Sequence, residues 1–337
     1  MKIILSGGGT MGSVTPLIAI SEQMPEAEIL FVGTKNGPEK EIIEVKKIKF
    51  IVISSAKFRR YFSGQNFIDL LKIIIICWQS FWLLYKEKPQ VIVSAGGYVA
   101  VPLIWMGWLL RIPSLVHSQD IKTGLAIKLV RPFATKITKA FSDTDLNAEV
   151  VGNPVRNLEI TTNIFKLKQD KPVVLITGGG TGAGGINNLI SKELFEIAQI
   201  IHLTGKAKNN NSLSHSDYHV FEFLNEAMIE ALQKADIIIT RAGLGTLTEL
   251  AMLEKPIIII PISNSHQEDN AEYFKKHQAA IVLSEVNLTA DKLNSVIKNL
   301  LNNKSQQTEL SSNIKTLIKP HASETLATII KQLANRT

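Results

Sequence analysis

One short pattern occurs twice in this chain of 337 residues and constrains its fold more than any other feature. The apolar run Ile3–Ser6 leads into the glycine-rich stretch Gly7–Gly12, and the run Val174–Thr177 leads into Gly178–Ala183. A strand that ends in a glycine turn and passes into a helix is the opening unit of a Rossmann-like domain. Because the chain also exceeds the ~150 residues usual for one domain, the repeat predicts two such domains.

Other apolar runs alternate with helix-like segments along the whole chain, which is typical of an α/β fold with parallel sheets. The runs are rich in Val and Ile and lack polar alternation, as expected of strands that helices cover on both faces. We expect a first domain over residues 1–156, a second over 157–320, and a closing helix over 321–337 that packs back on the first domain.

Charge is unevenly distributed along the chain. Residues 1–156 contain 19 Lys and Arg against 12 Asp and Glu, whereas residues 157–337 contain 18 of each, so the net charge of +7 belongs to the first half. A basic excess predicts an anionic partner such as nucleic acid, anionic lipid or phosphate. No aromatic-basic sheet motif or recognition helix supports nucleic acid, and we expect no such partner.

The single cysteine, Cys77, favours a reducing compartment, and the apolar start Ile3–Leu5 is too short for a secretory signal.

Glycine turns of this kind bind phosphate through unpaired backbone N–H groups and the positive end of the following helix. Gly7-x-Gly9-x-x-Gly12 formally matches the dinucleotide fingerprint. An NAD enzyme carries an acidic residue at the end of its second strand, but that strand ends here with Phe31–Thr34. This difference argues against NAD, and we expect no cofactor.

A third loop, Arg241–Glu249, follows the apolar run Ile237–Thr240. Its small residues allow the backbone to approach a phosphate, and the Glu249 carboxylate can accept hydrogen bonds from two ribose hydroxyls. Amide and carboxylate side chains of His266–Ala271 follow the next strand, at the sheet edge where ligands of α/β folds bind. The structural alternative for Glu249 is an acid that only stabilises the start of a helix.

Residues 67–85 form an apolar run that Asp69 and Lys72 interrupt, so they make a poor transmembrane span. Four aromatic side chains recur in it at helical spacing, amid the cations Lys57, Arg59, Arg60, Lys72, Lys86 and Lys88. Such a stripe is typical of a helix at the lipid headgroup level, which predicts an anionic membrane surface as partner. The alternative is an ordinary core helix. The predicted membrane residues are Trp78, Phe81, Trp82 and Tyr85.

The motifs, in their order and spacing, resemble those of the MurG family, the N-acetylglucosaminyltransferases of peptidoglycan synthesis. They are Gly8–Gly12, Gly96–Tyr98, Gly152–Arg156, Gly179–Ala183, Arg241–Glu249 and Gln267–Ala271, which together cover nearly the whole chain. The resemblance implies a GT-B fold, in which the parallel sheets of two Rossmann-like domains face a cleft. It also implies peripheral attachment to the cytoplasmic face of the inner membrane, and a role in cell wall biogenesis, cell shape, cell division and the cell cycle.

The implied activity is that of an inverting hexosyltransferase. It moves GlcNAc from UDP-GlcNAc to the C4 hydroxyl of undecaprenyl-pyrophosphoryl-MurNAc-pentapeptide, converting lipid I to lipid II. No metal is implied, and Asp143–Asp145 lacks the rest of a metal site. The second domain would hold the donor, with Glu249 on the ribose and with Gln267 and Asn270 toward the sugar. Further substrate-binding residues by resemblance are Thr10, Met11, Gly12, Asp120, Arg156, Gly180, Leu224, Leu244, Gly245, Thr246, Leu247 and Thr248.

The chain departs from the family pattern where the acceptor and the donor sugar should meet. Ser13 replaces a histidine that is a candidate for acceptor activation, Met11 replaces a glycine, and Gly180 replaces a serine. A serine hydroxyl is a weak base without a partner. We retain Ser13 and Asp120 as catalytic candidates and hypothesise that Asp120 replaces the missing histidine. We expect His117 to be a core or turn histidine.

Three alternatives share this pattern: a glycosyltransferase for another lipid such as diacylglycerol, a UDP-sugar epimerase, and a non-catalytic binding relic. The aromatic helix disfavours the epimerase, which needs no lipid patch. The intact Arg241–Glu249 and Gln267–Asn270 motifs disfavour the relic.

Overall fold

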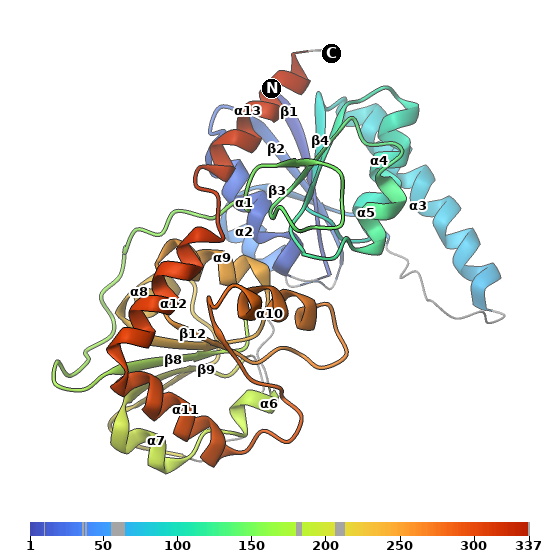
Figure 1. The fold of residues 1–337 in the computed structure, drawn as a ribbon. Helices are drawn as coiled ribbons and strands as arrows, with labels where there is room; N and C mark the ends of the chain where they lie inside the picture. The colour runs from blue at the N-terminus through green and yellow to red at the C-terminus, as the bar shows by residue number, and fades with distance from the viewer. Residues whose placement is uncertain are drawn as a thin grey trace. The chain divides into compact units, whose positions relative to one another are not determined.

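The computed structural model describes residues 1–9, 11–35, 37, 39–54, 65–179, 184–205 and 213–335, with side chains of the helix that begins at residue 65 described from residue 73. The chain forms two compact units, residues 1–156 with 319–337 and residues 157–318. Each unit is built on its own parallel sheet (Figure 1). The predicted α/β class with two Rossmann-like domains is confirmed.

The sheet of the first unit has the strand order β3-β2-β1-β4-β5-β6-β7, with neighbouring strands parallel. Successive strands are added in one direction from β1 to β3 and in the other direction from β4 to β7. The switch point between β1 and β4, at the carboxyl edge of the sheet, is where α/β folds bind ligands. The strands are β1 (Lys2–Ser6), β2 (Glu28–Gly33), β3 (Lys49–Val52), β4 (Val91–Ser94), β5 (Ser114–Ser118), β6 (Lys136–Lys139) and β7 (Glu149–Val150).

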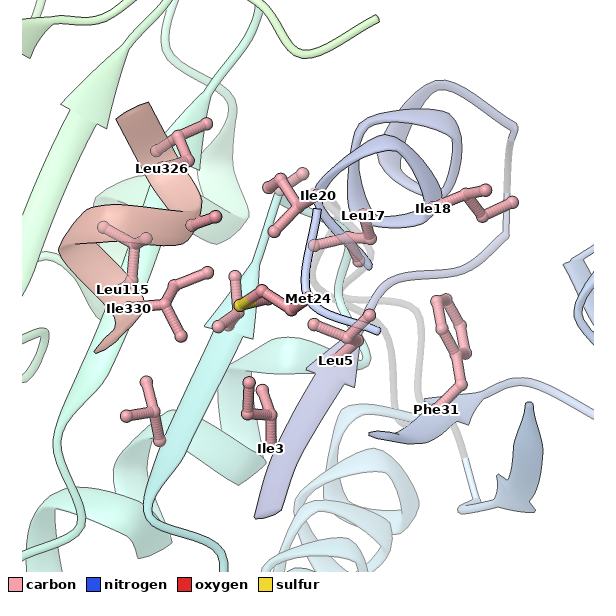
Figure 2. Packing of buried hydrophobic residues seen from close by; sticks show 14 of the residues in the cluster. Ile3, Leu5, Leu17, Ile18, Ile20, Met24, Phe31, Leu115, Leu326 and Ile330 are labelled. Atoms are coloured by element: carbon pink, nitrogen blue, oxygen red, sulfur yellow. The ribbon is translucent and has the colours of Figure 1, made fainter. Parts of the chain in front are cut away.

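Alternating side chains of β1 build two cores, one on each face of this sheet. Ile3 and Leu5 lie in the core that α1 and α13 cover (Figure 2), and Ile4 lies in the core that α3, α4 and α5 cover. Both faces are therefore buried, as the continuous apolar runs predict. The helices are α1 (Thr15–Glu22), α2 (Glu39–Val45), α3 (Gln65–Glu87), α4 (Ala100–Leu109), α5 (Leu125–Val130) and α13 (Ala322–Ala334), with the 3-10 helix η1 (Met11–Ser13).

The closing helix α13 belongs to the first unit. Leu326 and Ile330 are fully buried in the core shown in Figure 2, beside side chains of α1. Gly152 allows the returning chain to approach, because a Cβ there would lie 2.6 Å from the carbonyl oxygen of Lys319. Its φ of +86° also favours glycine.

The sheet of the second unit has the order β10-β9-β8-β11-β12-β13, again with parallel neighbours. Its strands are β8 (Val173–Thr177), β9 (Gln199–Leu203), β10 (Tyr218–Phe221), β11 (Ile237–Thr240), β12 (Ile257–Ile259) and β13 (Ile281–Val282). Its helices are α6 (Gly184–Asn187), α7 (Lys192–Ile197), α8 (Ala227–Lys234), α9 (Leu244–Met252), α10 (Gln267–Lys276), α11 (Ala290–Asn302) and α12 (Lys304–Thr316).

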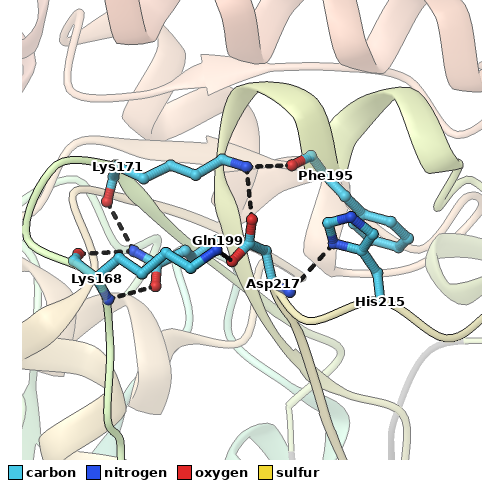
Figure 3. Close-up of polar contacts among 6 residues, drawn as sticks. All are labelled: Lys168, Lys171, Phe195, Gln199, His215 and Asp217. Atoms are coloured by element: carbon cyan, nitrogen blue, oxygen red, sulfur yellow. Dashed lines mark hydrogen bonds and ion pairs between the residues drawn. The ribbon is translucent and has the colours of Figure 1, made fainter.

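Polar contacts fasten the segment that enters the second unit to its sheet (Figure 3). The Nζ atoms of Lys168 and Lys171 lie 2.5 and 2.7 Å from the two carboxylate oxygens of Asp217. Hydrogen bonds from these lysines lower the pKa of Asp217 to about 2. The Gln199 side chain accepts from the backbone N–H of Lys168 at 2.6 Å and donates to its carbonyl oxygen at 2.9 Å.

A buried carboxylate on α8 holds the preceding part of the same segment. Glu230 accepts hydrogen bonds from the Thr162 hydroxyl at 2.8 Å and from the backbone N–H groups of Ile164 and Phe165 at 2.9 and 3.1 Å. The Lys234 Nζ lies 2.7 Å from it. Burial alone raises the pKa of Glu230, but the Lys234 contact and these hydrogen bonds outweigh it and bring the pKa to about 2.

The substitution Glu230→Gln should lower the free energy of unfolding by about 3 kcal/mol at pH 7, because it removes a carboxylate whose folded pKa lies below its unfolded value. A carboxylate with a lowered pKa in the folded state stabilises the fold at pH values above its pKa in the unfolded state. This stabilisation is lost as the pH falls toward the folded-state pKa. The difference in free energy of unfolding between wild type and variant should therefore decrease below about pH 4.5 and reach about half of its value at pH 7 near pH 3. Urea unfolding across this range measures it. Glu226→Gln, an exposed position on the same helix start, is the control, and a gap independent of pH would contradict the assignment.

Candidate functional site

The first glycine turn connects β1 to η1 in the first unit. Gly9 has a φ of +84°, and a Cβ there would lie 3.0 Å from the ring of Tyr98, so both backbone conformation and space require glycine. The backbone N–H of Gly8 donates to the Ser13 hydroxyl at 3.1 Å. Since Ser13 is only 7% exposed, its hydroxyl closes the turn from inside. A catalytic role for Ser13 stays a prediction, and the geometry gives this residue a positioning task.

The end of β5 is fastened to the same turn. The Gln119 Nε2 donates to the carbonyl oxygens of Gly12 at 2.9 Å and Ala95 at 3.1 Å, which join three neighbouring strand ends. Asp120 follows directly and is half-buried, and its carbonyl oxygen accepts from the Thr144 hydroxyl at 3.3 Å. Ser13 and Asp120 therefore lie at the same carboxyl edge of the first sheet.

His117 lies within β5 and is fully buried. Its Nδ1 lies 3.0 Å from the Thr138 hydroxyl. Burial lowers the pKa of His117 to about 4, so the imidazole is neutral at pH 7. The expectation of a core histidine is confirmed.

The remaining first-unit candidates differ in their exposure. Gly12 is exposed, Met11 is half-buried and packs partly against the core, and Arg156 is half-buried. Thr10 lies outside the described residues.

In the second unit the loop after β11 leads into α9. Gly243 caps the helix in an extended conformation, and Gly245 and Thr246 in its first turn are half-exposed. The Thr248 hydroxyl donates its hydrogen to the carbonyl oxygen of Leu244, one turn earlier in the helix, at 2.7 Å. The accessible part of the loop therefore includes the backbone of Gly243 and Gly245 at the positive helix end, which suits an anionic group.

The other predicted donor residues of the second unit lie deeper. Leu247 and Glu249 are buried in α9, and Leu224 is buried in the connection between β10 and α8. Gly180 lies outside the described residues.

Two amide side chains of α10 hold this loop. The Gln267 Oε1 accepts from the backbone N–H groups of Ala242 and Ile262, both at 3.2 Å. The Asn270 Nδ2 donates to the carbonyl oxygen of Ala242 at 3.1 Å, and Asn270 is 1% exposed. Predicted as sugar ligands, both residues also position the backbone of the α9 loop, and the Nε2 of half-buried Gln267 donates to no residue in the described part of the chain.

Sequence patterns did not identify Arg241 as more than the start of this loop. Its buried guanidinium donates to the carbonyl oxygens of Ile260 at 3.0 Å and Pro261 at 3.3 Å, and pairs with Glu285 at 2.5 Å. Arg241 therefore joins the ends of β11 and β12 to the segment after β13. A charged residue directly after a fully buried strand was the available signal.

An aromatic stripe lies on α3, made of Trp78, Phe81, Trp82 and Tyr85. Trp78 is 62% exposed, and its ring centroid lies 5.7 Å from that of Trp82, which lies 5.7 Å from that of Tyr85. Lys86 is exposed beside them. Of the other expected cations, Lys57, Arg59 and Arg60 and the side chain of Lys72 lie outside what the structure describes.

Within the described ranges, no helix combines the length and apolarity needed to cross a membrane. The same part of the chain contains no group of three or more His, Cys, Asp or Glu side chains that could hold a metal ion.

Solved structures with the same fold include a MurG and an epimerase. The crystal structure of Acinetobacter baumannii MurG matches 98% of this chain and 99% of its own, with a TM-score of 0.76 and 23% identity. The UDP-GlcNAc 2-epimerase from Neisseria meningitidis bound to UDP-GlcNAc matches 98% and 100%, with a TM-score of 0.73 and 13% identity. These likenesses confirm the GT-B fold, which both kinds of protein share.

Sequence comparisons separate the two kinds. Models of the glycosyltransferase family 28 N-terminal and C-terminal domains match residues 3–139 and 173–330. The UDP-N-acetylglucosamine–N-acetylmuramyl-(pentapeptide) pyrophosphoryl-undecaprenol N-acetylglucosamine transferase of Clostridium kluyveri is 38% identical over 89% of this chain and 91% of its own length. Its counterpart in Legionella pneumophila strain Paris is 37% identical over 99% and 97%. The chain therefore belongs to glycosyltransferase family 28 and, within it, to the MurG family of these N-acetylglucosamine transferases.

Proposed function

We propose that this protein is an inverting hexosyltransferase that moves GlcNAc from UDP-GlcNAc to the C4 hydroxyl of lipid I in peptidoglycan synthesis. The observation that carries the proposal is 37–38% identity, over nearly the full length, to enzymes named for this transfer. The product would serve cell wall biogenesis and, through it, cell shape and division.

The second unit supports donor binding through the loop that opens α9. The half-exposed residues Gly243, Gly245 and Thr246 would receive the UDP diphosphate at the positive helix end. Glu249 would accept the ribose hydroxyls, and Gln267 would reach the sugar through its Nε2. Asn270 would act through Ala242, whose carbonyl oxygen it holds.

We propose Asp120 as the residue that activates the acceptor, because it lies half-buried at the carboxyl edge of the first sheet, directly after Gln119. The C4 oxygen would attack the anomeric carbon of GlcNAc from the face opposite UDP, so that configuration inverts. The Asp120 carboxylate would take the C4 proton, and the bond to UDP would break with its electron pair on the departing diphosphate. Backbone N–H groups at the start of α9 would stabilise that charge. Ser13 would keep the neighbouring turn in place.

The aromatic stripe of α3 supports peripheral attachment to a membrane, and we propose the cytoplasmic face as its place. Exposed Trp and Tyr rings with apolar bodies and polar edges suit the headgroup level, and the first-half excess of positive charge would be drawn to anionic lipid. No role in binding nucleic acid is proposed.

Substrate choice decides between this function and transfer to another lipid. Labelled UDP-GlcNAc and UDP-glucose, each offered with lipid I or diacylglycerol in detergent, should give transfer only from UDP-GlcNAc to lipid I. Transfer only from UDP-glucose to diacylglycerol would establish the alternative transferase, and conversion of UDP-GlcNAc without any acceptor would establish an epimerase.

The substitution Asp120→Asn should lower kcat at least ~100-fold, because an amide cannot take the acceptor proton. Thermal stabilisation by UDP should persist, since the proposed donor residues are unchanged. Steady-state kinetics with lipid I and thermal unfolding with UDP measure the two effects. Asp143→Asn, at an exposed position of the same unit, is the control. Near-normal turnover of Asp120→Asn would exclude this residue as the base.

Replacing both Trp78 and Trp82 with alanine should weaken binding to phosphatidylglycerol vesicles at least ~10-fold, since each buried aromatic side chain contributes about 1.5–3 kcal/mol. Co-sedimentation with vesicles measures the loss, and stabilisation by UDP should be unchanged. Val45→Ala, at an exposed apolar position on α2, is the matched control. Equal vesicle binding by the double variant and wild type would mean that the stripe is not the membrane contact.

A further inference from the structure

The first residue of α2 places a carboxylate in the interior of the first unit. Glu39 is 0% exposed. Its Oε1 accepts from the backbone N–H of Thr34 at 2.8 Å and from the Thr34 hydroxyl at 2.5 Å, and its Oε2 accepts from the backbone N–H of Gly9 at 3.3 Å. Among the residues that the structure describes, no Lys or Arg pairs with it. The charge is therefore held by main-chain and hydroxyl dipoles.

Three glycines lie close to this side chain, one in the turn after β1 and two between the end of β2 and α2. A Cβ on Gly8, in the turn after β1, would lie 2.5 Å from Oε1. A Cβ on Gly33, at the end of β2, would lie 3.1 Å from Cγ, and one on Gly37 would lie 2.0 Å from Oε2. A larger residue at Gly8 or Gly37 would collide with the Glu39 carboxylate, whereas one at Gly33 would first meet the ring of Phe50, which lies 2.7 Å from that Cβ. The chain thus builds a cradle for an anion and fills it with its own side chain.

This occupancy changes what the first glycine turn can bind. A glycine turn after the first strand of a Rossmann-like domain attracts phosphate through its free amides. Here the Gly9 amide is already bonded to a negative charge. A diphosphate at the same place would meet that charge at short range in a buried setting, where repulsion is poorly screened.

We propose that Glu39 is a positioning residue for the acceptor: an internal anion that occupies the Gly8–Gly9 turn, shapes it and excludes substrate phosphate from it. The inference rests on the proposed function in treating this edge of the first sheet as the acceptor side. Glu39 acts on the reaction through the chain of contacts from Gly9 to Gly8, and from Gly8 to Ser13. Gln119, which holds the adjacent Gly12, directly precedes the proposed base Asp120.

Removing the Glu39 carboxylate and offering formate in its place tests the internal anion without any substrate. Glu39→Ala leaves the N–H groups of Gly9 and Thr34 facing a space that formate can enter. Sodium formate should raise the Tm of Glu39→Ala more than sodium chloride at equal ionic strength, and the two salts should act alike on wild type. Glu44→Gln, an exposed position on the same helix, is the control and should respond as wild type does.

Kinetics test the positioning role. Glu39→Ala should raise KM for lipid I at least ~10-fold, with KM for UDP-GlcNAc within about two-fold of wild type, and formate should partly restore the acceptor KM. Glu39→Gln can still accept from Thr34 through its Oε1, but it turns an N–H toward the N–H of Gly9. Glu39→Gln should raise KM for lipid I to the same extent, and formate should not restore it. This variant provides the test if Glu39→Ala does not fold.

Two results would overturn the proposal: formate acting no better than chloride on Glu39→Ala, or an unchanged KM for lipid I in a folded Glu39→Gln variant. Failure of the proposed function is distinguishable, because wild type would then not transfer sugar to lipid I while the formate effect on Tm would remain.

Discussion

Where the chain leaves a parallel sheet at its carboxyl edge, the backbone N–H groups no longer have a partner on a neighbouring strand. The structure of each site depends on which groups accept hydrogen bonds from them instead. In the first unit the Gly8 N–H is bonded to Ser13 and the Gly9 N–H to Glu39. In the second unit Gln267 takes the Ala242 N–H, but the next residues, which open α9, stay half-exposed. The first edge is thus closed by the chain's own side chains, and the second is left open to an anion.

Buried charged side chains elsewhere in the second unit also find their hydrogen-bond partners within the chain. Glu230 and Asp217 each collect several donors, which is how a carboxylate can be removed from water without a large cost. Both bind the segment that enters the unit, so charges in the interior hold a stretch of chain that has little regular structure of its own. Arg241 does the same for the strand ends beside α9.

Much of the fold was predictable because its signals are local. Ile3–Ser6 and Val174–Thr177, each running into glycines, predicted two Rossmann-like domains, and both runs are the first strands of their sheets. The loop Arg241–Glu249 was predicted as a phosphate site from its small residues, and its half-exposed backbone is compatible with that role. The roles of individual side chains were less predictable. Ser13 was considered for catalysis and closes a turn, while Asn270, expected near a sugar, holds Ala242.

The sequence by itself determined the α/β class, the repeated strand-turn-helix units and the aromatic stripe of α3, because hydrophobic periodicity and glycine placement act over a few residues. Only the tertiary structure decided the partners of the buried polar groups. The end of β2 carries no acid, yet Glu39, five residues beyond Thr34, turns back onto Gly9, 30 residues earlier in the chain. Such a pairing depends on which donors the folded chain leaves buried and unpaired at one place, and no local pattern encodes that.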